Sequence, residues 1–283
     1  MGPLRPALSN CAIAALSIDW RRRAGSVPNA QRRRNELRKH LIWALGLVFA
    51  LASVGIASAV PNTQTIDGKI TPSKLPKKGA AKPIKLFVDV SSTNSGNANQ
   101  VPNPTTNAKV DFDKDMKYQQ KGFPTCDSGG FTAATTTSQA KSDCGDSVIG
   151  SGSAKIQVPT ATGAPPLAVS ADVTAFNGKG KGIILFTYNT LSGGTVLNGK
   201  IKKSTASGYG VMLNVDVPPL AGGSAVIQEF NATINKKYKS GGKKLSILSS
   251  TCKDKKLKFQ ARFTDNAGQL ATGTDKQTCK KKG

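Results

Sequence analysis

Three aspartates at alternate positions are the residues of this chain whose spacing most resembles a reactive site. Asp111, Asp113 and Asp115 lie within the stretch KVDFDKDMKYQQ, in a chain whose net charge is +24. Carboxylates at this spacing bind calcium in EF-hand loops, which also need a glycine at the sixth position and an acid at the twelfth. Counted from Asp111, those places hold Met116 and Gly122. An irregular calcium site is therefore the only metal hypothesis left for this stretch.

The same stretch is better explained as the tip of a β-hairpin. Along an extended strand, alternate side chains point to opposite faces of the sheet. We therefore expect Val110 and Phe112 to point into a core and Asp111 and Asp113 to point outward. The residues DKD then form the turn that leads into the second strand, MKYQQ. This interpretation requires no cofactor.

Two further residue sets raise the question of catalysis. A carboxylate-dependent hydrolase would pair Asp111 or Asp113 with Glu229, but nothing in the sequence places these acids together. Ser138 and Lys141 match the S-x-x-K pattern of penicillin-binding proteins, whose S-D-N and K-T-G motifs are absent here. We therefore predict a protein that is not an enzyme and keep the Asp-dependent hydrolase as the least favoured alternative.

The first 59 residues are predicted to be a basic leader with an export signal. The uncharged apolar run 41–59 follows a basic stretch and ends in Ala57-Ser58-Ala59, the small-x-small pattern that signal peptidase reads. We expect cleavage after Ala59, and the alternative is an uncleaved anchor helix, because a run of this length can just span a bilayer core. The only histidine, His40, lies in this leader. Triads and zinc sites that use histidine are therefore excluded from the exported part.

The cysteines predict disulfides. Cys11 lies in the leader, which leaves an even number, four, for the exported part. An even count in an exported chain favours disulfides over metal or redox chemistry. Of the three pairings that four cysteines allow, the spacing favours Cys126–Cys144 and Cys252–Cys279.

Short alternating apolar segments, separated by clusters of Gly, Asn, Pro and Lys, predict an all-β fold. The predicted strands are 84–92, 108–112, 153–158, 167–176, 182–190, 195–203, 209–217, 225–234, 244–251 and 256–264. One short helix is expected at 135–144. About ten strands without helical crossovers favour a β-sandwich over an α/β architecture. We place that domain at 84–283 and interpret 60–83 as an extended, Lys/Pro-rich lead-in.

Parts of the chain resemble a group of exported actinobacterial proteins that are rich in lysine and strands. The resemblance is carried by the segments 123–156, 215–230 and 243–279, which contain a Cys-Gly-x-Ser-x-Ile/Val-Gly-x-Gly motif and a cysteine pair near the C-terminus. It implies export and a β-fold. Its motifs are cysteines, turns and glycines, so it assigns no active site.

The basic residues of the exported part suggest a polyanionic partner. They are all lysines except Arg262, and this part has no tryptophan. Nucleic-acid binders usually combine arginine with aromatic stacking residues, so we predict no nucleic-acid partner. Spread lysines suit attraction to anionic wall polymers such as teichoic acids, or to an anionic membrane surface. They equally well keep an exported protein soluble and protect the edges of sheets.

The sequence therefore leaves two main functional hypotheses. The first is a non-enzymatic protein of the cell envelope, structural or adhesive, that contacts anionic wall polymers through lysine. The alternative is a carbohydrate- or ligand-binding sandwich in which tyrosines stack on a sugar. The tyrosines available are Tyr118, Tyr188, Tyr209 and Tyr238. Their spacing does not place them on one face, so half-buried strand positions are the default interpretation.

Overall fold

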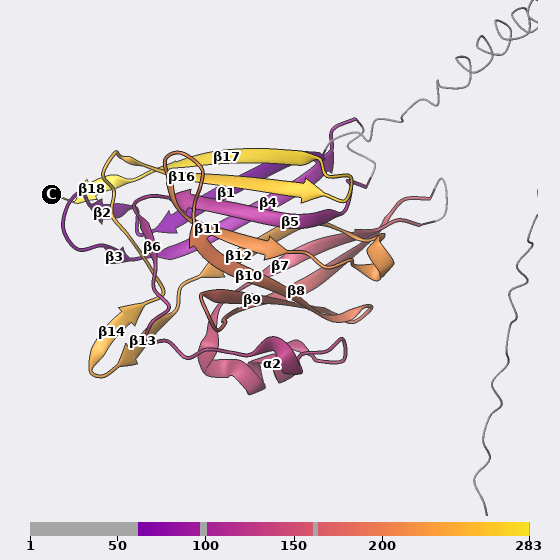
Figure 1. Ribbon diagram of the computed structural model, residues 1–283, viewed down its shortest axis with the longest axis horizontal. Helices are drawn as coiled ribbons and strands as arrows, with labels where there is room; N and C mark the ends of the chain where they lie inside the picture. The colour runs from indigo at the N-terminus through magenta and orange to yellow at the C-terminus, as the bar shows by residue number, and fades with distance from the viewer. Residues whose placement is uncertain (1–61, 97–100, 161–163, 283) are drawn as a thin grey trace, which may run out of the picture. The chain divides into compact units, whose positions relative to one another are not determined.

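One large antiparallel sheet dominates the structure (Figure 1). The computed structural model describes residues 62–96, 101–160 and 164–282. The predicted signal sequence, with Ala57 and Ala59, lies outside these residues. In the order of their hydrogen-bonded neighbours, the eleven strands are β1 (Asn62–Thr71), β4 (Lys85–Asn94), β12 (Val226–Ile234), β7 (Val148–Val158), β8 (Leu167–Asn177), β9 (Gly182–Asn189), β10 (Gly193–Lys203), β11 (Tyr209–Asp216), β5 (Thr105–Asp113), β16 (Lys256–Asp265) and β17 (Leu270–Thr278).

Smaller elements cover the ends and the outside of this sheet. Three short strands form a second sheet in the order β3 (Lys82–Pro83), β15 (Leu248–Ser250) and β6 (Met116–Tyr118). A separate hairpin joins β13 (Lys237–Ser240) to β14 (Lys243–Ser246), and β18 (Lys280–Lys282) runs parallel to β2 (Lys74–Pro76). The helical pieces are α2 (Thr137–Cys144) and the 3-10 turns η1 (Ser128–Gly130), η2 (Gly145–Ser147) and η3 (Ala221–Gly223).

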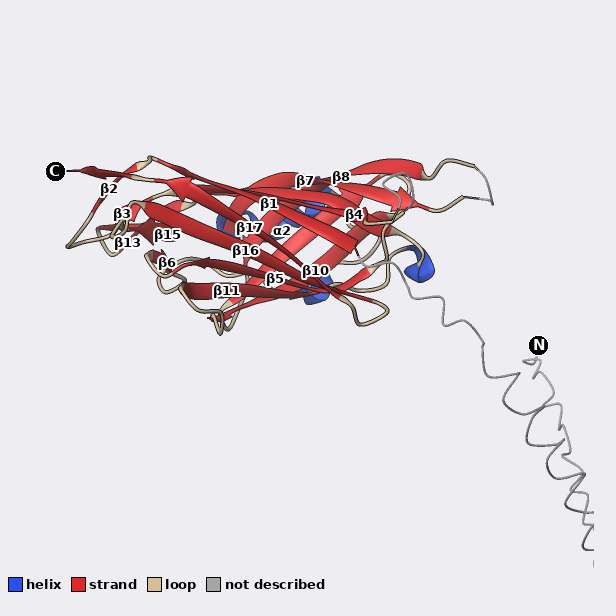
Figure 2. Cartoon of the chain, turned by 90° about the horizontal axis from the view of Figure 1, so that it is seen from above, coloured by secondary structure: helices blue, strands red, loops and turns tan. Residues whose placement is uncertain are grey.

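The large sheet curls over until its two end strands, β1 and β17, contact each other (Figure 2). Side chains of β17 bond to the backbone of β1 at this seam. The Gly68 amide donates to Asp275 Oδ2 at 3.0 Å, and Gln277 Nε2 donates to the Ile70 carbonyl at 3.1 Å. A Cβ on Gly273 of β17 would lie 2.7 Å from the Gln64 carbonyl oxygen of β1, so glycine at this position lets the two strands come this close.

The main core lies inside the curled sheet, and a second cluster lies outside it. Strand β9 is apolar on both faces: Ile183 and Leu185 join the inner core, whereas Ile184 and Phe186 join the outer cluster. Helix α2 covers this outer cluster through Ala140, which is fully buried. The uninterrupted apolar run of β9 thus reflects a strand buried on both sides.

The all-β prediction with one short helix is confirmed, and the two facing layers of the expected sandwich come from one continuous sheet. Both expected disulfides, Cys126–Cys144 and Cys252–Cys279, are present. In the described part of the chain, no helix is long and apolar enough to cross a membrane.

The predicted boundary between a lead-in at 60–83 and a domain at 84–283 is wrong. Residues 62–71 form β1 of the main sheet, where Ile66 and Ile70 belong to the core. Leu75 is fully buried beside the C-terminal strand β18. Every second residue of β1 is buried, and the exposed residues between them give the segment the polar character that suggested a lead-in.

Candidate functional site: an apolar cavity inside the sheet

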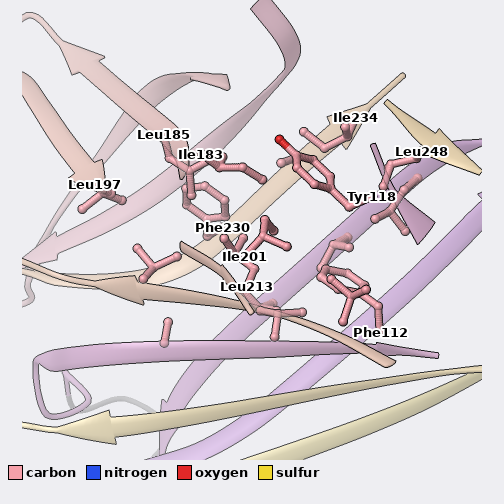
Figure 3. A pocket seen from close by; sticks show the side chains of 18 of the residues that line it. Phe112, Tyr118, Ile183, Leu185, Leu197, Ile201, Leu213, Phe230, Ile234 and Leu248 are labelled. Atoms are coloured by element: carbon pink, nitrogen blue, oxygen red, sulfur yellow. The ribbon is translucent and has the colours of Figure 1, made fainter. Parts of the chain in front are cut away.

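A cavity of about 130 Å³ lies between the facing parts of the curled sheet. Inward side chains from β4, β5, β9, β10, β11 and β12 line most of it, and β6, β15 and β16 contribute the rest (Figure 3). These side chains are apolar except Thr105, Lys117 and Tyr118. The cavity therefore offers almost no hydrogen-bonding partner to a polar molecule.

The cavity is long because it follows the strands. Along β11 and the residue that follows it, every second residue lines the cavity from Val211 to Val217, which corresponds to a length of roughly 20 Å at about 3.3 Å per residue. Its middle is lined by Phe230, Ile201 and Leu213 (Figure 3). An extended, narrow and apolar ligand would match this shape.

The end formed by β6 and β15 contains Lys117 and Tyr118, two of the three polar residues of the lining. Lys117 is exposed, and its neighbour Tyr118 points its hydroxyl group to Asn177 Oδ1 at 3.0 Å. Burial raises the pKa of the Tyr118 phenol well above its ordinary value, so the ring stays neutral at physiological pH. Tyr118, Ile234 and Leu248 lie close together at this end in Figure 3.

The structure places Asp111 and Asp113 on the outer face of β5, as predicted, but buries them completely there. Asp111 accepts hydrogen bonds from Arg262 Nε and Nη2, at 3.0 and 2.7 Å, and from Ser204 Oγ at 2.5 Å. Asp113 accepts bonds from the backbone amides of Asp115 and Lys258. Desolvation raises the pKa of Asp113, and these two amides partly oppose the shift.

The third aspartate has partners of its own. Asp115 accepts a hydrogen bond from the Lys253 amide at 2.6 Å and pairs with the Lys253 ammonium at 3.5 Å. The predicted turn is present between β5 and β6, but the predicted hairpin is wrong, because β5 pairs with β11 and β16 in the main sheet whereas β6 pairs with β15 in the small one. Among the described residues, no group of three or more His, Cys, Asp or Glu side chains is placed to hold a metal ion. The calcium hypothesis thus gains no support from this arrangement.

The residues of the hydrolase hypotheses are not brought together. Glu229 lies on β12, six strands from β5 in the sheet order, and pairs with Lys155 at 2.7 Å. Near it, Asp89 has a pKa raised by desolvation and by the charges of Glu229 and Asp67.

The S-x-x-K pattern also has a structural setting. Ser138 and Lys141 are exposed on the two-turn helix α2, whose first turn is closed by a capping box between Thr136 and Gln139. The pattern therefore lies on a solvated helix face.

The four tyrosines do not form a stacking platform. Tyr118 lines the cavity, whereas Tyr188 belongs to the outer cluster under α2. Tyr238 packs against Phe123 with ring centroids 6.0 Å apart, and Tyr209 lies beside Phe259. Their half-buried positions follow the default interpretation of the sequence.

A second, more open hollow lies on the outer face of β5, β10, β11 and β16. It has a volume of about 370 Å³, and its lining includes Lys109, Lys202 and Arg262 together with Asn107 and Asn214. Arg262 is held in place by the buried carboxylate of Asp111. The two lysines therefore supply the net positive charge of this hollow.

No protein-family model matches the chain, and no curated protein matches it either. The fold and the cavity define its class by themselves: an all-β, two-disulfide protein whose main sheet encloses an apolar space. The sequence showed which strand faces are apolar, but alternation alone does not reveal that inward side chains such as Val88, Ala108 and Ala232 are too small to fill the interior. The small size of these inward residues is a signal for the cavity in the sequence. It can be recognised only when one knows which strands face one another across the interior.

Proposed function

We propose that this protein binds a nonpolar molecule, or the nonpolar chain of an amphiphile, inside the curled sheet and outside the cytoplasm. The observation that carries the proposal is the cavity itself. Protein interiors are normally packed to a density of about 0.75, and apolar space left empty forfeits dispersion contacts. An engineered apolar cavity of roughly 150 Å³ stays dry and takes up benzene. The space here is similar in volume and is elongated.

Two further observations support a location outside the cytoplasm. Disulfides persist in oxidising compartments, and both pairs in this chain close loops of the β-domain. The leader 1–59 ends in the small-x-small pattern of a cleaved signal. A nonpolar ligand would need such a binding protein there, because free alkyl chains are poorly soluble in water.

Filling the cavity should abolish binding of a neutral fluorescent probe such as N-phenyl-1-naphthylamine. Ala232→Phe places an aromatic ring inside the cavity, and we expect the affinity for the probe to fall by at least about 10-fold, which corresponds to 1.4 kcal/mol. The measurement is a fluorescence titration of the disulfide-bonded protein, and competition with hexadecanol identifies the site.

The matched control for this experiment is Thr233→Phe, because Thr233 follows Ala232 on β12 and points to the outer face. This variant should bind the probe like the parent protein, and circular dichroism checks that both variants are folded. Unchanged binding in a folded Ala232→Phe protein would contradict the proposal. So would a parent protein that does not bind the probe.

A second candidate function is association with anionic wall polymers. The observation in its favour is the outer hollow, where Lys109 and Lys202 lie beside Arg262. We expect the protein to pellet with isolated Gram-positive cell walls at about 50 mM salt but not at about 500 mM, because the Debye length shortens several-fold over this range. Lys109→Gln combined with Lys202→Gln should reduce pelleting at low salt. A protein that stays in the supernatant at both salt concentrations would exclude this function.

A further inference from the structure

The hairpin β13–β14 begins and ends at the cavity. Ile234, the last residue of β12, lines the cavity just before the hairpin, and Leu248 lines it just after. Leu248 is also the register partner of Tyr118, another lining residue. The base of the hairpin thus lies at the same end of the cavity as Tyr118 (Figure 3), the residue that follows Lys117 on β6.

Packing holds the hairpin at this end. The Ile247 amide donates to the Lys236 carbonyl at 3.0 Å, and the Gln119 amide donates to the Ile247 carbonyl at 2.9 Å. Tyr238 packs on Phe123, and Leu245 lies against Gly122. The hairpin is therefore fixed to the loop that follows β6, and its charges keep a defined place relative to the cavity.

This end of the molecule is strongly cationic. The residues 235–253 contain no Asp or Glu, and neither do residues 116–126. The exposed lysines of the hairpin are Lys237, Lys239, Lys243 and Lys244. Lys117 lines the cavity and is exposed as well. Five exposed ammonium groups thus lie on β6 and on the hairpin whose base is at this end of the cavity, and their fields add because no acid within these segments offsets them.

We propose that the ligand is an anionic amphiphile, whose alkyl chain occupies the cavity and whose carboxylate, sulfate or phosphate group lies among Lys117 and the lysines of the β13–β14 hairpin. This inference rests on the proposed function and adds the chemistry of the headgroup. An anionic group cannot enter the apolar interior without losing its hydration, so it stays at the rim. The cavity lining offers a charged partner at one place only, Lys117 on β6, and β6 pairs with β15, the strand that follows the hairpin in the chain.

The test compares ligands that share one chain and differ in the headgroup. Palmitate, hexadecanol and hexadecyltrimethylammonium are titrated against the neutral probe bound to the full exported chain. We expect palmitate to displace the probe at about 10-fold lower concentration than hexadecanol at roughly 50 mM salt, and the cationic ligand to be the weakest. The preference should shrink at about 500 mM salt, because the rim charges are then screened.

Charge-removing variants locate the headgroup. Lys237→Gln, Lys239→Gln, Lys243→Gln and Lys244→Gln, combined in one protein, should remove most of the preference for palmitate and leave hexadecanol binding unchanged. Lys117→Gln alone should have a smaller effect in the same direction. The matched control carries four exposed lysines of outward strand positions changed to glutamine: Lys69, Lys200, Lys202 and Lys276.

Each outcome separates the two proposals. Equal affinity for palmitate and hexadecanol in the parent protein overturns the headgroup inference and leaves the cavity function standing. Absence of probe binding overturns both. If the hairpin variant keeps its preference for palmitate but loses binding to vesicles of anionic phospholipid, the lysines contact a membrane surface and the headgroup inference is wrong. An equal loss of preference in the control variant shows general attraction and also overturns it.

Discussion

Arg262→Ala should destabilise the protein by about 3–5 kcal/mol, the loss found when one partner of a buried ion pair is removed. Asp111 is fully buried, and Arg262, the only arginine after residue 59, gives it two of its three hydrogen bonds. Without the guanidinium, the carboxylate keeps only the Ser204 hydroxyl and must either stay charged without a counter-ion or take up a proton. The measurement is urea unfolding followed by fluorescence or circular dichroism.

Three further variants test this explanation. Lys202→Ala, in the same hollow, should change the stability by less than about 0.5 kcal/mol, because that lysine makes no buried pair. Arg262→Lys should recover only part of the loss, since an ammonium cannot present two donors in the planar arrangement of a guanidinium. The double variant Asp111→Asn with Arg262→Ala should lose less than the sum of the single variants. Additive losses would show that the pair is not coupled.

Gly152→Ala should be the second severe substitution. A Cβ at this position would lie 1.9 Å from the carbonyl oxygen of Asn231 and 2.8 Å from the Cα of Ala232, both on the backbone of the neighbouring strand β12. The strands must move apart to admit the methyl group, because the backbone cannot rotate away as a side chain can. We expect a loss of about 3 kcal/mol or more, measured by thermal or urea unfolding.

The same motif supplies the control. Gly145 belongs to the Cys-Gly-x-Ser-x-Ile-Gly-x-Gly segment, but its Cβ would meet nothing within 4 Å, and its backbone is helical with φ −51° and ψ −44°. Gly145→Ala should therefore be neutral or slightly stabilising, because alanine restricts the unfolded chain. Gly150→Ala should resemble Gly152→Ala, since its Cβ would lie 2.1 Å from the Thr233 carbonyl oxygen. Equal effects at all three glycines would contradict the backbone-contact explanation.

The fold was largely predictable because most strands alternate strongly. All ten predicted strands correspond to observed ones, including β9, whose long apolar run reflects burial on both faces. Of the eleven strands of the main sheet, the sequence did not reveal β1 and β17, at the seam. Their inward positions hold residues such as Gln64, Gly68 and Gly273, which are polar or small. Strands that approach each other closely need such small residues at their inward positions. Their presence interrupts the alternation of apolar and polar residues from which a strand is predicted.

The candidate site was less predictable. The aspartates that drew attention in the sequence serve the packing of the β5–β6 turn and of Arg262, because each carboxylate has separate partners. The cavity depends on which inward residues face one another across the curled sheet, and pairs far apart in the sequence, such as Val88 and Leu213, decide this. A lysine-rich hairpin such as 237–246 looks like ordinary surface until its base is found at the cavity.

The contact between β1 and β17, which lie near opposite ends of the described chain, affects how the molecule can assemble. β1 receives the side chains of Asp275 and Gln277 from more than 200 residues away in the sequence, and β18 completes β2 beside it. The chain is synthesised from its N-terminus to its C-terminus. The sheet therefore cannot close until residues 270–282 have been synthesised and are free to fold. Contacts of such large sequence separation make folding slow. Closure of the cavity is therefore among the last steps of assembly, and shortening the C-terminus should leave the apolar interior open to solvent.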